Sequence, residues 1–312
     1  MTTRPQFPDE QSKSGQFERQ EDAFRYFISS DGSTPFPAEA GRYHLYISLA
    51  CPWASRTLIA LKVKGLEEFI GFTVVDPVRD DRGWAFRDGP GYSHDPINGF
   101  AFLSEAYVAS DPGYRGRVTV PVLWDKLSKR IVNNSEDDIC RMFNDEFTSH
   151  ANNTDLFPSS IRDEQEELSR FIYGTVNNGV YKAGFATEQN AYASACIQLF
   201  KSLDFLEERL SKNRYLFGPG IVEADWRLFC TLIRFDAVYH GHFKCNIRRI
   251  KDYSNLHGYL LDLYQQPGMA ETVNFEHIKR HYYMTHEEIN PNRIVPIGPL
   301  EDFTAPHCRE KL

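Results

Sequence analysis

One cysteine and the proline after it constrain the fold of this chain more than any other feature. An apolar run over residues 43–50 leads into Cys51, and Pro52 begins a stretch with helical character. Proline suits the first position of a helix because no hydrogen bond is lost there. The unpaired N–H groups and the positive dipole end of a helix start stabilise a thiolate. The pattern therefore predicts a strand, a nucleophilic cysteine at the turn, and a helix.

The residue three positions after Cys51 is Ala54. A Cys-X-X-Cys pair can resolve its own disulfide, whereas a single cysteine depends on a thiol from outside the chain. Any sulfur exchange at this site therefore requires an external thiol. The alternative is a small apolar side chain buried at a turn, and the strand, Cys-Pro and helix context favours the nucleophile.

Length and composition limit the remaining possibilities. The chain has 312 residues, a length that suits two domains, and a net charge of -8. An acidic surface argues against general nucleic-acid or anionic-membrane binding. The six cysteines are scattered, as in reduced cytoplasmic proteins, and no apolar segment is long enough to span a membrane. The polar residues 1–19 lack the apolar core of a secretory signal.

The first half of the chain has the element order of a thioredoxin-like domain. A strand, a helix that ends at Gly65 and a second strand form a βαβ unit, and two strands of a hairpin and a helix follow. The predicted ranges are 43–48, 53–64, 69–75, 118–124, 129–132 and 136–143. We expect an α/β domain over 41–148, interrupted by a long Asp-, Gly- and aromatic-rich insertion at 76–116.

The remaining residues predict an arm and a helical domain. Residues 1–40 form an extended arm anchored by a few aromatic side chains, and residues 149–312 form an all-α domain with a C-terminal extension. Its strongest helix is 187–210, where apolar residues recur at helical spacing. Another helix begins near residue 223. Asp225 stands at the acidic position of a capping box there, but Val222 replaces the usual Ser or Thr.

Val120-Pro121 opens a predicted strand directly after the long insertion. A proline in that position suits a cis peptide bond, and in a thioredoxin-like fold it packs beside the active cysteine. The backbone of Val120 would then pair with a bound peptide. The alternative is an ordinary proline of an edge strand.

Polar residues at 133–137 stand at a predicted helix start. Backbone N–H groups and the Ser135 hydroxyl can hold a carboxylate, and acidic side chains such as Glu136 can hold an α-ammonium group. A ligand with both groups, such as the γ-glutamyl end of glutathione, fits that pattern. Simple helix capping is the alternative, and both can hold together.

The insertion and the helical half add further candidates. Trp84 supplies an aromatic wall, and arginines of the insertion suit a carboxylate through paired hydrogen bonds, although they can also be solvated loop charges. The segment 240–245 contains two histidines and a cysteine but lacks a second ligand pair, so we expect no metal. The arginine candidates are Arg87, Arg115 and Arg117, and the candidate hydroxyl donors are Tyr173, Tyr181, Tyr239, Tyr282 and Tyr283.

Five segments together resemble the S-glutathionyl-hydroquinone reductases, the Xi-class glutathione transferases. The resemblance runs from about residue 43 to residue 307, and its two most specific strings surround Cys51 and Tyr181. It implies a glutathione-transferase fold, an α/β thioredoxin-like N-terminal domain followed by an all-α C-terminal domain, in a cytoplasmic homodimer. The segments are 43–54, 83–84, 117–125, 175–186 and 271–279.

The resemblance also implies the roles of individual residues. Cys51 is the nucleophile, and Tyr181 and Tyr282 line the hydroquinone pocket and hydrogen-bond the oxygens of the substrate. Glutathione, the co-substrate, is held by four groups of residues. They are Trp84, Arg117, the backbone of Val120, and the Ser135/Glu136 corner.

The chain departs from the family at that corner. The family reads Asn-Glu-Ser where this chain reads Asn134-Ser135-Glu136. A carboxylate then stands where the carboxylate of glutathione docks. We expect the Glu136 side chain to swing outward and Ser135 to take over part of the role.

Taken with the resemblance, the site predicts a glutathione-dependent oxidoreductase that reduces glutathionyl-hydroquinones through a mixed disulfide of Cys51 and glutathione. Two alternatives remain open. One is an omega-like thioltransferase or dehydroascorbate reductase that uses the same cysteine. The other is a non-catalytic ligand-binding protein on the same fold.

Overall fold

The computed structural model describes residues 10, 12 and 14–312, which form two compact units. The sheet unit consists of Gln20–Asp155 and Thr272–Thr285. The helical unit consists of the described residues up to Arg19, Leu156–Glu271 and His286–Leu312. This division differs from the expected one because the arm is shared between the units and a late helix joins the sheet unit.

A four-stranded mixed sheet forms the centre of the sheet unit. The strands run in the order β4 (Gly71–Val74), β3 (Tyr43–Ile47), β5 (Val122–Asp125) and β6 (Arg130–Asn133). β3 is parallel to β4 and antiparallel to β5, which is antiparallel to β6. All five residues of β3 are buried, as the continuous apolar run of a central strand requires. The predicted thioredoxin-like order is thereby confirmed.

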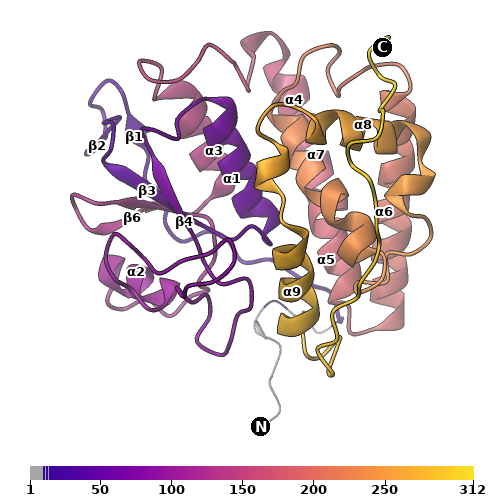
Figure 1. Cartoon of the computed structure of the whole chain (residues 1–312), viewed down its shortest axis with the longest axis horizontal. Helices are drawn as coiled ribbons and strands as arrows, with labels where there is room; N and C mark the ends of the chain where they lie inside the picture. The colour runs from indigo at the N-terminus through magenta and orange to yellow at the C-terminus, as the bar shows by residue number, and fades with distance from the viewer. Residues whose placement is uncertain (1–9, 11, 13) are drawn as a thin grey trace. The chain divides into compact units, whose positions relative to one another are not determined.

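Three helices accompany this sheet. α1 (Pro52–Val63) and α3 (Glu136–Asp145) pack against each other, and α2 (Leu103–Ser110) contacts β6. Figure 1 shows α1 and α3 beside each other on one side of the sheet and α2 on the other. A short parallel pair, β1 (Ile28–Ser29) and β2 (Phe36–Pro37), precedes β3. The sequence of these elements brings the start of α1 and the start of α3 to the same side of the sheet.

The insertion at 76–116 is ordered by a buried carboxylate. Asp95 accepts hydrogen bonds from the Tyr46 hydroxyl on β3 (2.9 Å) and from three backbone N–H groups of its own loop, those of Ile97, Asn98 and Phe100. The second half of the insertion contains α2. The insertion is thus held to the central strand by a polar contact.

The late helix α9 (Phe275–Thr285) belongs to the sheet unit through two histidines. His277 contacts the carbonyl of Pro90 through Nε2, and His281 contacts the carbonyl of Pro77 through Nδ1, both at 2.7 Å. Because a carbonyl only accepts, each of these ring nitrogens carries a proton and donates. α9 therefore fixes the two ends of the first half of the insertion.

The helical unit is built around α6 (Gln189–Leu210). Its buried positions Cys196, Leu199, Leu203, Leu206 and Leu210 form the predicted apolar stripe. α5 and α8 pack against it. The other elements are η2 (Ser159–Ile161), α4 (Arg162–Ile172), η3 (Tyr173–Asn177), α5 (Asn178–Gly184), α7 (Glu223–Arg234), η4 (Phe235–Tyr239), η5 (Ile250–Asp252) and α8 (Ser254–Tyr264), and η6 (Ala270–Thr272) precedes α9.

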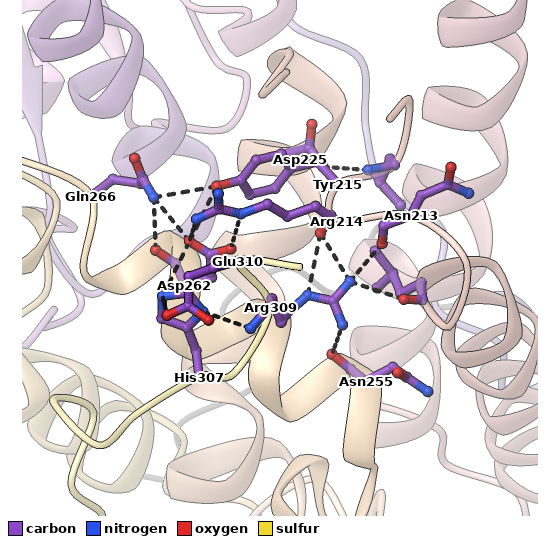
Figure 2. Close-up of polar contacts among 12 residues, drawn as sticks. Asn213, Arg214, Tyr215, Asp225, Asn255, Asp262, Gln266, His307, Arg309 and Glu310 are labelled. Atoms are coloured by element: carbon purple, nitrogen blue, oxygen red, sulfur yellow. Dashed lines mark hydrogen bonds and ion pairs between the residues drawn. The ribbon is translucent and has the colours of Figure 1, made fainter. Parts of the chain in front are cut away.

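The C-terminal segment 286–312 has no helix or strand, yet its end is firmly anchored. The buried Arg309 donates hydrogen bonds to the backbone carbonyls of Leu210, Asn213, Arg214 and Asn255, at 2.6–3.3 Å. Figure 2 shows this guanidinium beside a second group in which Asp262 accepts from Arg214 and Gln266. Because Leu210 ends α6, Arg309 caps a carbonyl group that the helix itself leaves unpaired.

Within the described part of the chain, every helix is too short or too polar to cross a lipid bilayer.

Candidate active site

Cys51 lies at the N-terminus of α1. It is the N-cap residue, with Pro52 in the first helical position as predicted, and its side chain is partly exposed. Its thiol lies 3.7 Å from the carbonyl oxygen of Val120. The peptide bond between Val120 and Pro121 is cis, which confirms the prediction from the sequence. The structure thus brings together the thiol, the helix start and the backbone beside the cis-proline.

The other cysteines have different surroundings. Cys140, Cys196, Cys230 and Cys245 are buried, and burial raises the pKa of Cys196 and of Cys245, which keeps both protonated. Cys308 is exposed, but it lies in the C-terminal segment. Cys51 alone among the six stands at a helix start with solvent access, which is the environment of a nucleophilic thiol.

The start of α3 holds Ser135 and Glu136. Ser135 is the N-cap residue and is buried. The Glu136 carboxylate is also buried, and it lies 3.3 Å from the guanidinium of Arg56 on α1. The expectation that this side chain swings outward is wrong, because Arg56 draws the carboxylate inward. Arg56 also pairs with Asp137, so two carboxylates share one cation.

Burial dominates the protonation of Glu136. It raises the pKa of the carboxyl to about 7, a shift that Arg56 opposes and that the negative charges of Asp137 and Asp22 increase. Glu136 therefore changes its charge close to neutral pH. An anionic ligand at the start of α3 meets a neutral group below that pH and a negative charge above it.

Two asparagines fix the backbone before α3. Asn133 accepts from the backbone N–H of Ser135 (2.7 Å), and Asn134 accepts from that of Phe24 (2.8 Å). The Asn134 amide also donates to the Tyr107 hydroxyl of α2, at 3.3 Å. The corner that carries Ser135 is therefore held by its own Asn133 and by two separate parts of the sheet unit, at Phe24 and at α2.

Trp84 is buried within the insertion. Its ring stacks on His281 of α9, with 5.0 Å between centroids and 18° between planes, and the Arg79 guanidinium also contacts it. Tyr282 is buried and meets the same histidine edge-on, at 5.2 Å. His281 thus connects two predicted site residues, Trp84 and Tyr282. The contact between Trp84 and His281 could not be predicted from the sequence, because the two residues are far apart in the chain.

The three candidate arginines, Arg87, Arg115 and Arg117, differ in their contacts. Arg87 pairs with Asp76 (3.1 Å) and Asp80 (2.9 Å), so it stabilises the loop itself. Arg115 donates to the backbone carbonyl of Tyr114. Arg117 is half-buried, and its carbonyl accepts from the Tyr114 hydroxyl at 2.5 Å, which fixes its backbone three residues before Val120.

Tyr181 belongs to the helical unit, on α5. Its ring lies within a cluster of aromatic side chains, with 5.4 Å between its centroid and that of Phe243. Phe17 of the N-terminal arm belongs to the same cluster, although its residue type alone indicated only an apolar anchor. The other members are Phe185 and Tyr239.

His242 of the segment 240–245 packs among other aromatic rings. His242 lies 3.1 Å from His286, ring nitrogen to ring nitrogen, and stacks on Phe243. Among the residues that the structure describes, no three His, Cys, Asp or Glu side chains are arranged to hold a metal ion.

Comparison with known proteins identifies the family. The model of the glutathione S-transferase N-terminal domain matches residues 50–146, and that of the C-terminal domain matches 189–261. Glutathionyl-hydroquinone reductase YqjG of Escherichia coli is 51% identical over 97% of this chain and 94% of its own length. The chain belongs to the glutathionyl-hydroquinone reductase family. The predicted family and glutathione-transferase fold are thereby confirmed.

Other relatives agree with that assignment. Glutathionyl-hydroquinone reductase PcpF of Sphingobium chlorophenolicum is 46% identical over 94% of this chain and 93% of its own length. The glutathione-bound structure of YqjG superimposes with a TM-score of 0.91 over 93% of this chain and 96% of that one. A Xi-class transferase from Natrialba magadii, 48% identical, also reaches 0.91, over 93% of this chain and 89% of its own.

Proposed function

We propose that this protein reduces glutathionyl-hydroquinones to hydroquinones at the expense of glutathione. The Cys51 thiolate attacks the glutathione sulfur of the aromatic thioether and forms a sulfur–sulfur bond as the carbon–sulfur bond breaks. The aromatic carbon takes the bonding electron pair and a proton. A second glutathione thiolate then attacks the mixed disulfide, which releases oxidised glutathione and restores Cys51. Ala54 leaves no internal thiol to intercept that intermediate.

The single observation that carries this proposal is the position of Cys51. Its thiol combines a helix start, solvent access and contact with the carbonyl of Val120 at the cis-proline. Relatives that align over nearly the whole chain are named for the same reaction. A peptide-like thiol ligand suits this place because the backbone of Val120 offers it a strand-like partner.

In this proposal, residues of the sheet unit hold glutathione. The Val120 backbone pairs with the cysteinyl part, Trp84 and Arg117 contact the glycyl end, and the Ser135/Glu136 corner holds the γ-glutamyl group. The N-terminus of α3 favours the carboxylate of that group through its N–H groups and dipole. The burial of Glu136 supports the proposal, because its carboxyl is neutral below about pH 7.

Tyr181 and Tyr282 are proposed to donate hydrogen bonds to the ring oxygens of the hydroquinone. A donor at those oxygens stabilises the negative charge that develops as the carbon–sulfur bond breaks. Tyr181 lies among aromatic side chains and Tyr282 lies beside the ring of His281, and such rings suit a flat aromatic substrate.

We also propose that the protein acts in the cytoplasm, as a homodimer and without a metal. No disulfide joins any of its six cysteines, all of which the structure describes, and reduced thiols suit a reducing compartment. Light scattering behind a sizing column will measure the dimer mass, and a monomer at micromolar concentration would contradict that part of the proposal.

Replacement of the nucleophile tests the mechanism. We expect C51S to lose reduction of a glutathionyl-hydroquinone by at least about 1,000-fold, because a serine hydroxyl is not ionised at neutral pH. C308S is the matched control, since it removes an exposed cysteine from the C-terminal segment. Chromatography that follows the conjugate, the hydroquinone and oxidised glutathione is the measurement. Full activity of C51S would contradict the mechanism.

Parallel assays separate the alternatives. A thioltransferase or dehydroascorbate reductase would favour hydroxyethyl disulfide or dehydroascorbate over the aromatic conjugate, and a binding protein would turn over none of them. The ratio of kcat/KM between the three substrates decides the assignment.

A further inference from the structure

The N-terminal arm makes a tight turn at Gly15, where it contacts the residues just before α6. Gly15 has a φ of +74°, and its carbonyl accepts from the backbone N–H of Thr187 at 3.2 Å. A side chain at Gly15 would place its Cβ 2.6 Å from Cγ of Glu188. Only glycine combines this left-handed conformation with so close an approach. The turn directs the following residues toward the aromatic cluster of Tyr181.

Phe17 is the residue of the N-terminal arm that packs in the aromatic cluster of Tyr181. Its ring is 6% exposed and lies 5.5 Å from Phe185 and 6.3 Å from Tyr181, measured between centroids. Rings at such distances contribute packing energy beyond the area that they bury. Phe17 therefore restricts the movement of the Tyr181 ring as well as covering it.

Arg19 contacts both the ring of Tyr181 and the helix that carries it. Its guanidinium carbon lies 5.3 Å from the centroid of Tyr181 and 5.8 Å from that of Phe17. Its Nε donates to Oδ1 of Asn178 at 3.1 Å. Asn178 precedes Tyr181 by one helical turn on α5, so the two contacts of Arg19 lie on one helix face. Arg19 makes both contacts with a planar group and an Nε donor, and a lysine side chain has neither of these.

We propose that Phe17 and Arg19 are positioning residues that orient the Tyr181 phenol and so set the preference of the enzyme for aromatic conjugates. This inference rests on the proposed function, in which Tyr181 donates to an oxygen of the hydroquinone. A hydrogen bond to a leaving aromatic ring depends on the position of the hydroxyl, and a tyrosine side chain that is free to change its χ1 angle moves that hydroxyl away. A disulfide substrate has no ring oxygen for Tyr181 to contact, so it gains less from the arm.

The ratio of two reactions tests the inference. R19A should lower kcat/KM for a glutathionyl-hydroquinone about tenfold more than kcat/KM for hydroxyethyl disulfide. R19K should behave similarly, because it keeps the charge but loses the planar contact and the Nε donor. F17A should show a smaller loss in the same direction. R249A is the matched control: it removes an exposed surface arginine paired with Asp252, and should leave the ratio unchanged.

A double-mutant cycle shows whether Arg19 acts through Tyr181. In a Y181F background, R19A should reduce conjugate turnover by less than twofold, since the hydroxyl that it orients is already absent. Additive losses, or equal losses in both reactions, would overturn the role of the arm. A wild-type protein that does not reduce the conjugate would overturn the proposed function as well, so the two failures are distinguishable.

Discussion

Two helices of this protein begin with a buried carboxylate, and the surroundings of the two differ. Glu136 occupies the first position of α3 in the sheet unit, and Asp225 occupies the third position of α7 in the helical unit. Burial raises the pKa of both, to about 7 for Glu136 and to about 6 for Asp225. The difference between them lies in what stabilises the charged form.

Asp225 is surrounded by fixed hydrogen-bond donors. Its carboxylate accepts from the backbone N–H groups of Leu216 and Val222, both at 2.9 Å, and from the Tyr259 hydroxyl at 2.8 Å. Figure 2 shows Asp225 beside the polar group of Arg214, Tyr215 and Asp262. Val222 cannot supply the side-chain half of a capping box, so among side chains it is the Asp225 carboxylate that ties the preceding turn to α7.

Glu136 has a cation where Asp225 has fixed donors. Arg56 faces it from α1, Asp137 competes for that cation, and Asp22 adds a further negative charge. Fixed backbone donors keep the Asp225 carboxylate in one position at any pH at which it is charged. A shared cation permits a change of charge near neutral pH, which agrees with a stabilising role for Asp225 and with the ligand-binding role proposed for Glu136.

The strongest test of this difference between the two carboxylates is the removal of the Asp225 carboxylate, for which we expect the largest effect. D225A leaves two backbone N–H groups and a tyrosine hydroxyl without their acceptor, and we expect it to lower the free energy of unfolding by about 3 kcal/mol. Urea unfolding followed by circular dichroism measures the change. A loss below about 0.5 kcal/mol would show that Asp225 does not stabilise the fold.

D225N provides the control for charge. Because the folded-state pKa of Asp225 lies above its ordinary value, the folded protein binds this proton more tightly than the unfolded chain. Its contribution to stability is therefore greatest below about pH 4 and falls as pH rises through about 6. The stability of the wild type relative to D225N should fall over that range and stay constant above about pH 7.

A smaller effect tests Glu136 through ligand affinity. As pH rises through about 7, Glu136 becomes negative beside the proposed site of the γ-glutamyl carboxylate, so binding should weaken. We expect the Kd of S-methylglutathione, which has no thiol to titrate, to rise about tenfold from pH 6 to pH 8, or ~1.4 kcal/mol. Isothermal titration calorimetry measures that Kd.

E136Q should give a flat profile over the same range, because it keeps the shape of the side chain without its charge. E208Q removes an exposed carboxylate from α6 and should retain the wild-type slope. Equal slopes for wild type and E136Q would assign the pH dependence to another group.

The smallest expected effect comes from Y259F, which tests how much the Tyr259 hydroxyl contributes to holding the Asp225 carboxylate. Y259F removes one of its three donors and leaves the two backbone donors in place, so we expect a loss of about 1 kcal/mol in the free energy of unfolding. A loss as large as that of D225A would mean that the hydroxyl, rather than the backbone, holds the carboxylate.

Local patterns were sufficient to predict much of the sheet unit. The strand, Cys51 and Pro52, and the proline after the insertion each depend on residues that are adjacent in the chain. The order of strands follows from the order of elements, because a βαβ unit and a hairpin have few ways to share a sheet. The cysteine and its cis-proline neighbour were therefore predictable without any knowledge of distant contacts.

Contacts between distant residues could not be predicted in the same way. Arg56 turns Glu136 inward although the residues lie on different helices, and His277 and His281 bind carbonyl groups 187 and 204 residues earlier in the chain. Backbone carbonyls leave no trace in the residue types of a sequence. The roles proposed for individual site residues also remain predictions until variants are measured.

The path of the chain through its two units has a consequence for synthesis. The chain passes from the helical unit to the sheet unit and back, then repeats this exchange to add α9. On the ribosome, the sheet unit lacks its last helix until residue 285 has emerged, by which time the core helices of the other unit are already outside. A nascent chain of this protein therefore cannot complete one unit before it begins the other, and a protease cut at residues 146–158 would yield two incomplete fragments rather than two domains.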